Sequence, residues 1–202
     1  MNQPMPESGF PAFIARSLAG SREVAVALEQ DARLHQVLAD AATACVNCLR
    51  TGHKILLAGN GGSAADCQHI AAELVGRFMF DRAPLPAIAL TTDTSALTAI
   101  GNDYGFESVF SRQLAALGQA GDVFIGLSTS GNSANILAAA RQARTHGLVC
   151  IGLTGRAGGA LREHCDVLLN VPADATPDIQ VCHITLGHLL CDLIERALFI
   201  RP

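Results

Sequence analysis

The residues best suited to chemistry gather in one short stretch of the chain, KILLAGNGGSAADCQHIAAE, which spans Lys54–Glu73. It opens with Ile55–Ala58, an apolar run bounded by glycine and too short for a helix. The glycine-rich turn Gly59–Ser63 follows, and then an alanine-rich segment that is typical of a helix. A buried strand that leads through glycines into a helix N-terminus forms an anion site, because the backbone approaches closely and the helix dipole favours negative charge.

His69 and Glu73 lie farther along the same expected helix, four residues apart. This spacing places an imidazole and a carboxylate on one helix face, where they could bind one metal ion or share one proton. An isolated pair of this kind is more often a surface ion pair or a core histidine. The nearby glycine turn is the reason to consider a functional site.

A second loop rich in hydroxyl groups, Ser128–Ser133, follows the expected strand Asp122–Leu127. Four hydroxyls and the backbone N–H groups of a helix N-terminus suit a phosphate monoester, which needs many donors. Alone, a serine-rich turn is usually a solvated helix cap. Two such loops at the ends of strands in one sheet favour phosphate binding.

The last expected helix, Asp178–Phe199, is apolar except for a few polar side chains, among them Gln180, His183 and His188. On a helix of 3.6 residues per turn, these three residues lie on one broad side. Spacing alone does not choose between the two histidines.

Short apolar strands alternate with helices along the rest of the chain. The expected strands are Ile55–Ala58, Ala87–Leu90, Asp122–Leu127, Leu148–Leu153 and Asp166–Val171. The other expected helices are Phe10–Glu29, Leu34–Arg50, a piece that ends at Ile100, Phe106–Leu117, Ala134–Thr145 and a short one after Thr154–Gly159. Gly101–Gly105 is expected to be a polar loop. Continuous apolar strands predict a parallel sheet covered on both faces, with ligands at the carboxyl ends of its strands.

Two other motifs give weaker signals. Gly59–Ala64 matches the dinucleotide pattern G-x-G-x-x-A, which needs an acidic residue about twenty positions later at the end of the second strand. Here the acidic residue that follows that strand is Asp93, more than thirty positions after Gly59, so a nicotinamide enzyme is disfavoured. Cys45 and Cys48 form a lone C-x-x-C within a helical pattern, without a second pair for a zinc ribbon.

Composition indicates a globular protein, and we expect one domain over residues 1–202. Half of the residues are apolar, 16% are charged, and the net charge is −4 without a basic cluster, which disfavours nucleic-acid binding. No apolar run approaches the ~20 residues that cross a bilayer, and Met1–Gly9 does not resemble a secretory signal. Seven scattered cysteines fit reduced thiols and a cytoplasmic location.

Four segments together resemble one family. GNGGSAADCQHIAAELVGR, AIGNDYGFESVFSRQ, GDVFIGLSTSGNSANIL and IQVCHITLGH are similar to the sugar isomerase (SIS) fold and, more narrowly, to bacterial phosphoheptose isomerases. The resemblance implies a three-layer α/β/α sandwich, with a flavodoxin-like five-stranded parallel sheet and N-terminal helices before the first strand. It also implies a homotetramer whose active sites lie between subunits.

The resemblance further implies an aldose–ketose isomerase. The family interconverts sedoheptulose 7-phosphate and D-glycero-D-manno-heptose 7-phosphate, the first step toward ADP-heptose for lipopolysaccharide or capsule. Glu73 and His188 match its base and acid. Its zinc ligands, one ion per subunit, are matched by His69, Glu73, Gln180 and His188. Its substrate contacts are matched by Asn60, Gly61, Gly62, Ser63, Glu73, Asn102, Asp103, Ser128, Thr129, Ser130, Ser133 and Gln180. His183 is then a structural residue.

The chemistry of such a reaction suits these side chains. Moving a carbonyl between C1 and C2 requires a base for a carbon-bound proton, an acid, and stabilisation of an enediolate. Two histidines and a carboxylate suit zinc, with Gln180 as an unusual and weaker oxygen donor. Because zinc weakens a bound carboxylate as a base, we expect a loosely bound metal or a ligand that swings away.

Two rival interpretations remain. The same subfamily includes non-catalytic tetrameric scaffolds that associate with the replication initiator, and LLCDLIERALF resembles them somewhat. Those relatives lack the complete metal and acid–base set, whereas this chain carries all four matching residues, which favours the enzyme. A sugar-phosphate-sensing regulatory domain is less favoured, because the sequence shows no DNA-binding segment.

Overall fold

The computed structural model describes residues 6–200, and its central element is a five-stranded parallel sheet. The strands run in the spatial order β2-β1-β3-β4-β5. They are β1 (Ile55–Gly59), β2 (Ala87–Ala89), β3 (Val123–Leu127), β4 (Val149–Thr154) and β5 (Val167–Asn170). This is the flavodoxin-like order. The predicted fold class is therefore confirmed.

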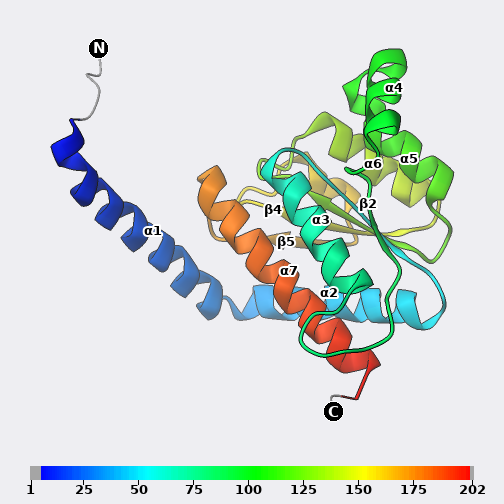
Figure 1. Ribbon diagram of the computed structural model, residues 1–202, viewed down its shortest axis with the longest axis horizontal. Helices are drawn as coiled ribbons and strands as arrows, with labels where there is room; N and C mark the ends of the chain where they lie inside the picture. The colour runs from blue at the N-terminus through cyan, green and yellow to red at the C-terminus, as the bar shows by residue number, and fades with distance from the viewer. Residues whose placement is uncertain (1–5, 201–202) are drawn as a thin grey trace.

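Helices cover both faces of the sheet because its strands are apolar on both sides (Figure 1). Leu57 and Ile125, neighbours in register, pack under α2 (Ala32–Arg50), α3 (Gly62–Val75) and α7 (Thr176–Leu198). Leu56 and Phe124 face the other way, toward α5 (Val109–Leu117) and α6 (Ala134–Thr145). The sheet thus becomes the middle of three layers.

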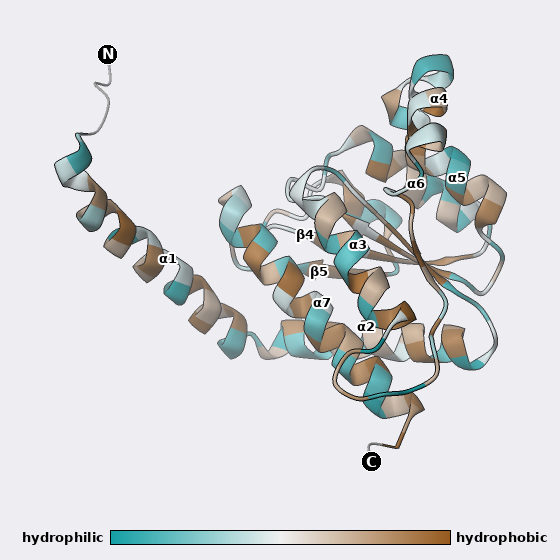
Figure 2. Ribbon diagram, viewed as in Figure 1, coloured by the Kyte–Doolittle hydropathy of each residue, from teal (hydrophilic) through white to brown (hydrophobic). Residues whose placement is uncertain are grey.

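Two helices project from this body. The long N-terminal helix α1 (Phe10–Gln30) has no buried residue, and Figure 2 shows hydrophobic residues along its projecting part. On the other side of the molecule, α4 (Thr94–Tyr104) also projects (Figure 1). Short 3-10 helices, η1 (Glu7–Gly9), η2 (Phe106–Ser108) and η3 (Ala160–His164), complete the described chain.

One sequence prediction about α4 is wrong. The sequence predicts a loop over Gly101–Gly105, but the helix continues through Tyr104. The Asp93 side chain caps the helix start by accepting from the Ala96 N–H at 2.9 Å, and α4 then tolerates Gly101 in its interior. Gly105, at φ 84°, ends the helix with a backbone conformation that suits glycine.

The cysteines pack as free thiols. Cys45 and Cys48 are buried in α2, and burial raises the pKa of Cys48 to about 11, so this pair packs as inert core thiols. No helix within residues 6–200 is both long and apolar enough to span a bilayer. The segment Met1–Gly9, which does not resemble a secretory signal, lies outside the described part of the chain in its first five residues.

Candidate active site

The two polar loops meet at the point where the chain switches from one face of the sheet to the other. β1 leads into α3 on one face, and its neighbour β3 leads into α6 on the opposite face. The side-chain amides of Asn60 and Asn135 exchange two hydrogen bonds of 2.9 Å and join the first loop to the start of α6, the helix that follows the second loop. Sheets of this order bind ligands in the crevice at such a switch point.

Glycines bring the first loop close to the start of α3. A Cβ at Gly59 would lie 2.6 Å from the Ser63 carbonyl oxygen, so no larger residue fits without movement. Gly61 precedes the helix at φ 55°. A Cβ at Gly62 would lie 2.6 Å from Nε2 of Gln180, which places that amide over the first turn of α3. The Ser63 and Ala64 N–H groups already donate to the carbonyls of Asn60 and Gly61, so the attraction for an anion at this end of α3 comes mainly from the helix dipole.

The second loop offers hydroxyls of unequal accessibility. Ser128 is buried, and its Oγ lies 2.9 Å from the Ser133 Oγ. Ser130 is exposed and accepts from the Asn132 N–H at 3.1 Å, while Thr129 is half-buried. Ser130 is therefore the most accessible of these hydroxyls, whereas Thr129 and Ser133 are both half-buried.

Two imidazoles and a carboxylate meet farther along α3. His69 Nε2 lies 2.9 Å from His188 Nε2 and 3.2 Å from Glu73 Oε1, and one donor atom from each residue falls within 4.8 Å of the others. The contact is possible because α3 and α7 pack side by side (Figure 1). A Cβ at Gly187 would lie 2.6 Å from the Ile70 Cδ1, so glycine permits this close approach.

Of the two histidines on α7 that spacing could not distinguish, the structure places His188 in this cluster. His183 is fully buried, and neither of its ring nitrogens has a hydrogen-bond partner among the described residues. Burial lowers the pKa of His183 to about 4, so this imidazole is neutral near pH 7. It is a core residue, as the resemblance implied.

The three side chains fit a zinc ion. Nitrogen and oxygen ligands at ~2.1 Å from zinc in a tetrahedral site lie about 3.4 Å from each other. The two contacts made by His69 Nε2, 2.9 and 3.2 Å, are close to that spacing, and the donor atoms of Glu73 and His188 lie within 4.8 Å of each other. Gln180 is placed differently, over Gly62, and no hydrogen bond joins it to the three residues within the described chain.

Sequence reasoning overlooked two neighbours of this cluster. Asp66 lies one turn before His69 on α3, and its Oδ2 is buried without a hydrogen-bond partner among residues 6–200. Burial raises the pKa of Asp66, while the nearby His69 and His188 act in the opposite direction. The ring of Phe78 stacks on His188, with centroids 5.6 Å apart and planes inclined by 21°. The spacing D-x-x-H was a signal for Asp66, whereas nothing local predicted Phe78.

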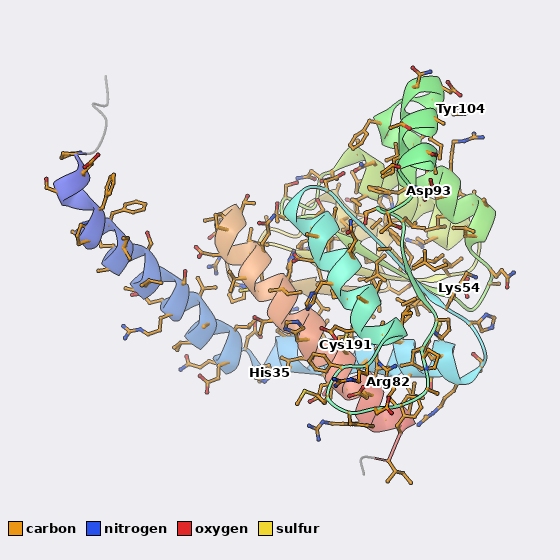
Figure 3. The ribbon with its side chains drawn as sticks, viewed as in Figure 1. His35, Lys54, Arg82, Asp93, Tyr104 and Cys191 are labelled. Atoms are coloured by element: carbon orange, nitrogen blue, oxygen red, sulfur yellow. The ribbon has the colours of Figure 1, made fainter. Side chains whose placement is uncertain are left out.

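The predicted contacts Asn102 and Asp103 lie elsewhere in the chain. Both are exposed near the end of α4, where the Asn102 amide donates to Asp103 at 2.8 Å. Figure 3 shows the next residue, Tyr104, toward the top of the view and Cys191 of α7 in its lower half. One chain alone therefore does not bring these two residues to the His69 cluster.

Comparison with known proteins identifies the family. The family model described as the SIS domain matches residues 21–155, two thirds of the chain. The chain belongs to the SIS domain family. Among its relatives is the phosphoheptose isomerase of Burkholderia pseudomallei, which is 57% identical over 187 residues, or 93% of this chain and 95% of the relative.

Solved structures of SIS domain proteins agree with this assignment. A phosphoheptose isomerase from Neisseria gonorrhoeae is 49% identical with a TM-score of 0.87, and the match covers 93% of this chain and 99% of that one. One from Francisella tularensis is 40% identical with a TM-score of 0.88, over 92% and 97% of the two chains. Within the SIS family the chain thus belongs with the phosphoheptose isomerases, and it is an enzyme of the isomerase class.

Proposed function

We propose that this isomerase interconverts D-sedoheptulose 7-phosphate and D-glycero-D-manno-heptose 7-phosphate through an enediolate. The observation that carries the proposal is the cluster of His69, Glu73 and His188, whose donor atoms lie within 4.8 Å of one another. It unites a carboxylate base with an imidazole acid, the pair that an aldose–ketose isomerase needs. The similarity to phosphoheptose isomerases supports a seven-carbon sugar phosphate as the substrate.

Different side chains bind the phosphate end of the substrate and act on its reacting end. The Ser128–Ser133 loop and the start of α3 bind the phosphate and position the reacting carbons. In the ketose-to-aldose direction, the Glu73 carboxylate removes a proton from C1, and the His188 imidazole supplies the proton that C2 receives. The proton on O1 moves to O2 in the same exchange, so the carbonyl moves from C2 to C1, and proton exchange with water returns Glu73 and His188 to their starting states.

We propose one zinc ion per subunit, bound by His69, Glu73 and His188, with Gln180 as the fourth ligand by resemblance to the family. Zinc, when bound, supplies a Lewis acid for the substrate carbonyl oxygen. The spacing of the donor atoms around His69 supports this assignment. Gln180, over Gly62, also lies where it can contact the substrate between the phosphate loops and the cluster.

We further propose a homotetramer with active sites between subunits. On α1 the large apolar side chains of Phe13, Ile14 and Leu18 are 50, 55 and 67% exposed within one chain. A groove of about 270 Å³ between α1 and α7 is lined mainly by apolar side chains, among them Val24, Leu28 and Leu189. A second copy of this amphipathic helix suits the groove, since burying such surface against a like chain is favourable.

In its cellular role, we propose that the enzyme works in the cytoplasm and catalyses the first step toward ADP-heptose for lipopolysaccharide or capsule. Its partners would be the phosphosugar and other copies of the same chain, without direct contact to nucleic acid or membrane. The net charge of −4 supports the absence of a nucleic-acid partner.

The oligomer can be tested at Leu18. Replacing Leu18 by aspartate should convert the assembly to smaller species at micromolar concentration, because the charge would be buried in the apolar interface. Light scattering coupled to size-exclusion chromatography measures the mass. The matched control is Leu117→Asp on α5, where leucine is 42% exposed, and this variant should keep the parental mass. Equal masses for both variants and the parent would show that α1 is not part of the interface.

The function itself can be tested by turnover. Purified protein should convert sedoheptulose 7-phosphate to the aldose, lose activity on treatment with a zinc chelator, and regain it with added zinc. Unphosphorylated sedoheptulose is the matched control and should react far more slowly, because the loops lack their anion. An assembled, zinc-supplied protein without turnover would reject this substrate and reaction, and binding to the replication initiator would then be measured. The scaffold is the second candidate because of the C-terminal segment LLCDLIERALF.

A further inference from the structure

A buried ion pair lies beside the His69 cluster and has no part in the reaction described above. The side chains of Arg82 and Glu195 are 2% and 1% exposed, and Arg82 Nε donates to Glu195 Oε1 at 2.9 Å. Figure 3 shows Arg82 next to Cys191, close to α7. Arg82 comes from the segment between α3 and β2, whereas Glu195 lies near the end of α7.

Arg82 contacts the end of the helix that carries Glu73. Its guanidinium donates to the carbonyl oxygen of Glu73 at 2.8 Å and to that of Leu74 at 2.7 Å. These carbonyls belong to the last turn of α3, where a helix has no N–H partners of its own. The guanidinium therefore fixes the backbone from which the Glu73 carboxylate projects.

Glu195 contacts the segment that touches His188. Its carboxylate accepts from the backbone N–H groups of Phe78 and Met79 at 3.1 and 2.8 Å. The Phe78 ring stacks on the His188 imidazole. One carboxylate thus fixes the backbone of the residue that packs on the proposed acid.

We propose that Arg82 and Glu195 form a positioning pair that aligns Glu73 and His188 with each other. The inference rests on the proposed function for the roles of these two residues. Arg82 acts through the end of α3, and Glu195 acts through Phe78. Both α3 and α7 carry side chains of the reactive cluster. Without the ion pair, the carbonyls in the last turn of α3 would lack the Arg82 donors, and the backbone of Phe78 would lack the Glu195 acceptor.

The geometry suits arginine in particular. Three different nitrogens of Arg82 donate, Nε to Glu195, Nη1 to Leu74 and Nη2 to Glu73. Lysine keeps the charge but presents one compact ammonium group, which cannot reproduce this planar set of donors. Arg82→Lys is therefore the informative variant, because it keeps the buried carboxylate paired while loosening the α3 terminus.

Two kinds of measurement test the proposal. For Arg82→Lys we expect kcat to fall about tenfold with little change in KM, because misplaced reacting groups slow the chemical step while the phosphate loops lie elsewhere. The ring signals of His188, read by NMR on histidine-labelled protein and assigned with His188→Gln, should also shift, although Phe78 is unchanged.

A matched pair of phenylalanine variants provides the control. Phe78 and Phe199 are both half-buried, and the Phe199 ring lies 5.7 Å from the Arg82 guanidinium carbon. Phe78→Leu should lower kcat and shift the His188 signal, whereas Phe199→Leu should leave both as in the parent.

The outcomes separate this proposal from the proposed function. If Arg82→Lys and Phe78→Leu lower only the unfolding temperature, with the His188 signal and kcat unchanged, the pair is structural and the inference fails. If the parent protein shows no turnover, the proposed function fails. The NMR signal would then still report whether Arg82 positions His188, since that measurement needs no substrate.

Discussion

Replacing Glu73 by glutamine is expected to lower kcat for isomerisation of the heptose phosphate about a thousandfold. The amide cannot accept the proton from C1, and it is a weaker ligand for zinc. Because Glu73 is partly exposed, with 24% of its side-chain surface accessible, the substitution should leave the fold intact. Steady-state kinetics with saturating zinc measures the effect, and the unfolding temperature checks the fold.

The same substitution at an exposed glutamate elsewhere in the chain provides the control. Glu163→Gln changes an exposed carboxylate in η3 and should keep the parental kcat. If Glu73→Gln retains more than about a tenth of the parental kcat, Glu73 is not the general base, since general base catalysis typically contributes a hundredfold or more.

Variants of the two histidines should distinguish zinc ligation from proton transfer. His69 is assigned only as a ligand, so His69→Ala should lower zinc affinity and recover part of its activity at high zinc concentration. His188 is also the proposed acid, so His188→Ala should stay inactive under the same conditions. Equal recovery of both variants would contradict the acid role of His188. His164→Ala, in η3, is the histidine control.

The fold was largely predictable because its signals are local. Runs such as Ile55–Ala58 are apolar on both faces, and only a parallel sheet covered by two helical layers buries both sides. The failure at Gly101–Gly105 has a physical cause. Glycine and asparagine have poor intrinsic helix propensity, but a cap at Asp93 and continuation of α4 to Gly105 overrode it.

The site was predictable only in part. His69 and Glu73 share one helix, so spacing sufficed to pair them. His188 could not be distinguished from His183 by spacing, because the choice depends on which side of α7 faces α3 and which faces the core. Phe78 gave no signal either, since it reaches the cluster through a loop that the buried Arg82–Glu195 pair fixes.

The second large effect is expected at Gly131, in the Ser128–Ser133 loop that we propose binds the phosphate. This residue has φ 68°, and a Cβ there would lie 2.1 Å from the backbone oxygen of Gly158. Gly131→Ala therefore combines backbone strain with a clash against backbone, and we expect it to lower the free energy of unfolding by about 3 kcal/mol. The loop that carries Ser130 must move, so KM for the sugar phosphate should also rise, about tenfold.

Gly52→Ala separates the effect of backbone strain from the effect of the steric clash. Gly52 also has positive φ, 81°, but no heavy atom within 4 Å of a built Cβ, so alanine there should lower the free energy of unfolding by only about 1 kcal/mol. Denaturant unfolding of both variants measures the difference. Equal losses in the free energy of unfolding would mean that the backbone around Gly158 moves away from the new Cβ at little cost. A destabilised Gly131→Ala with unchanged KM would remove this loop from phosphate binding and leave the start of α3 as the anion site.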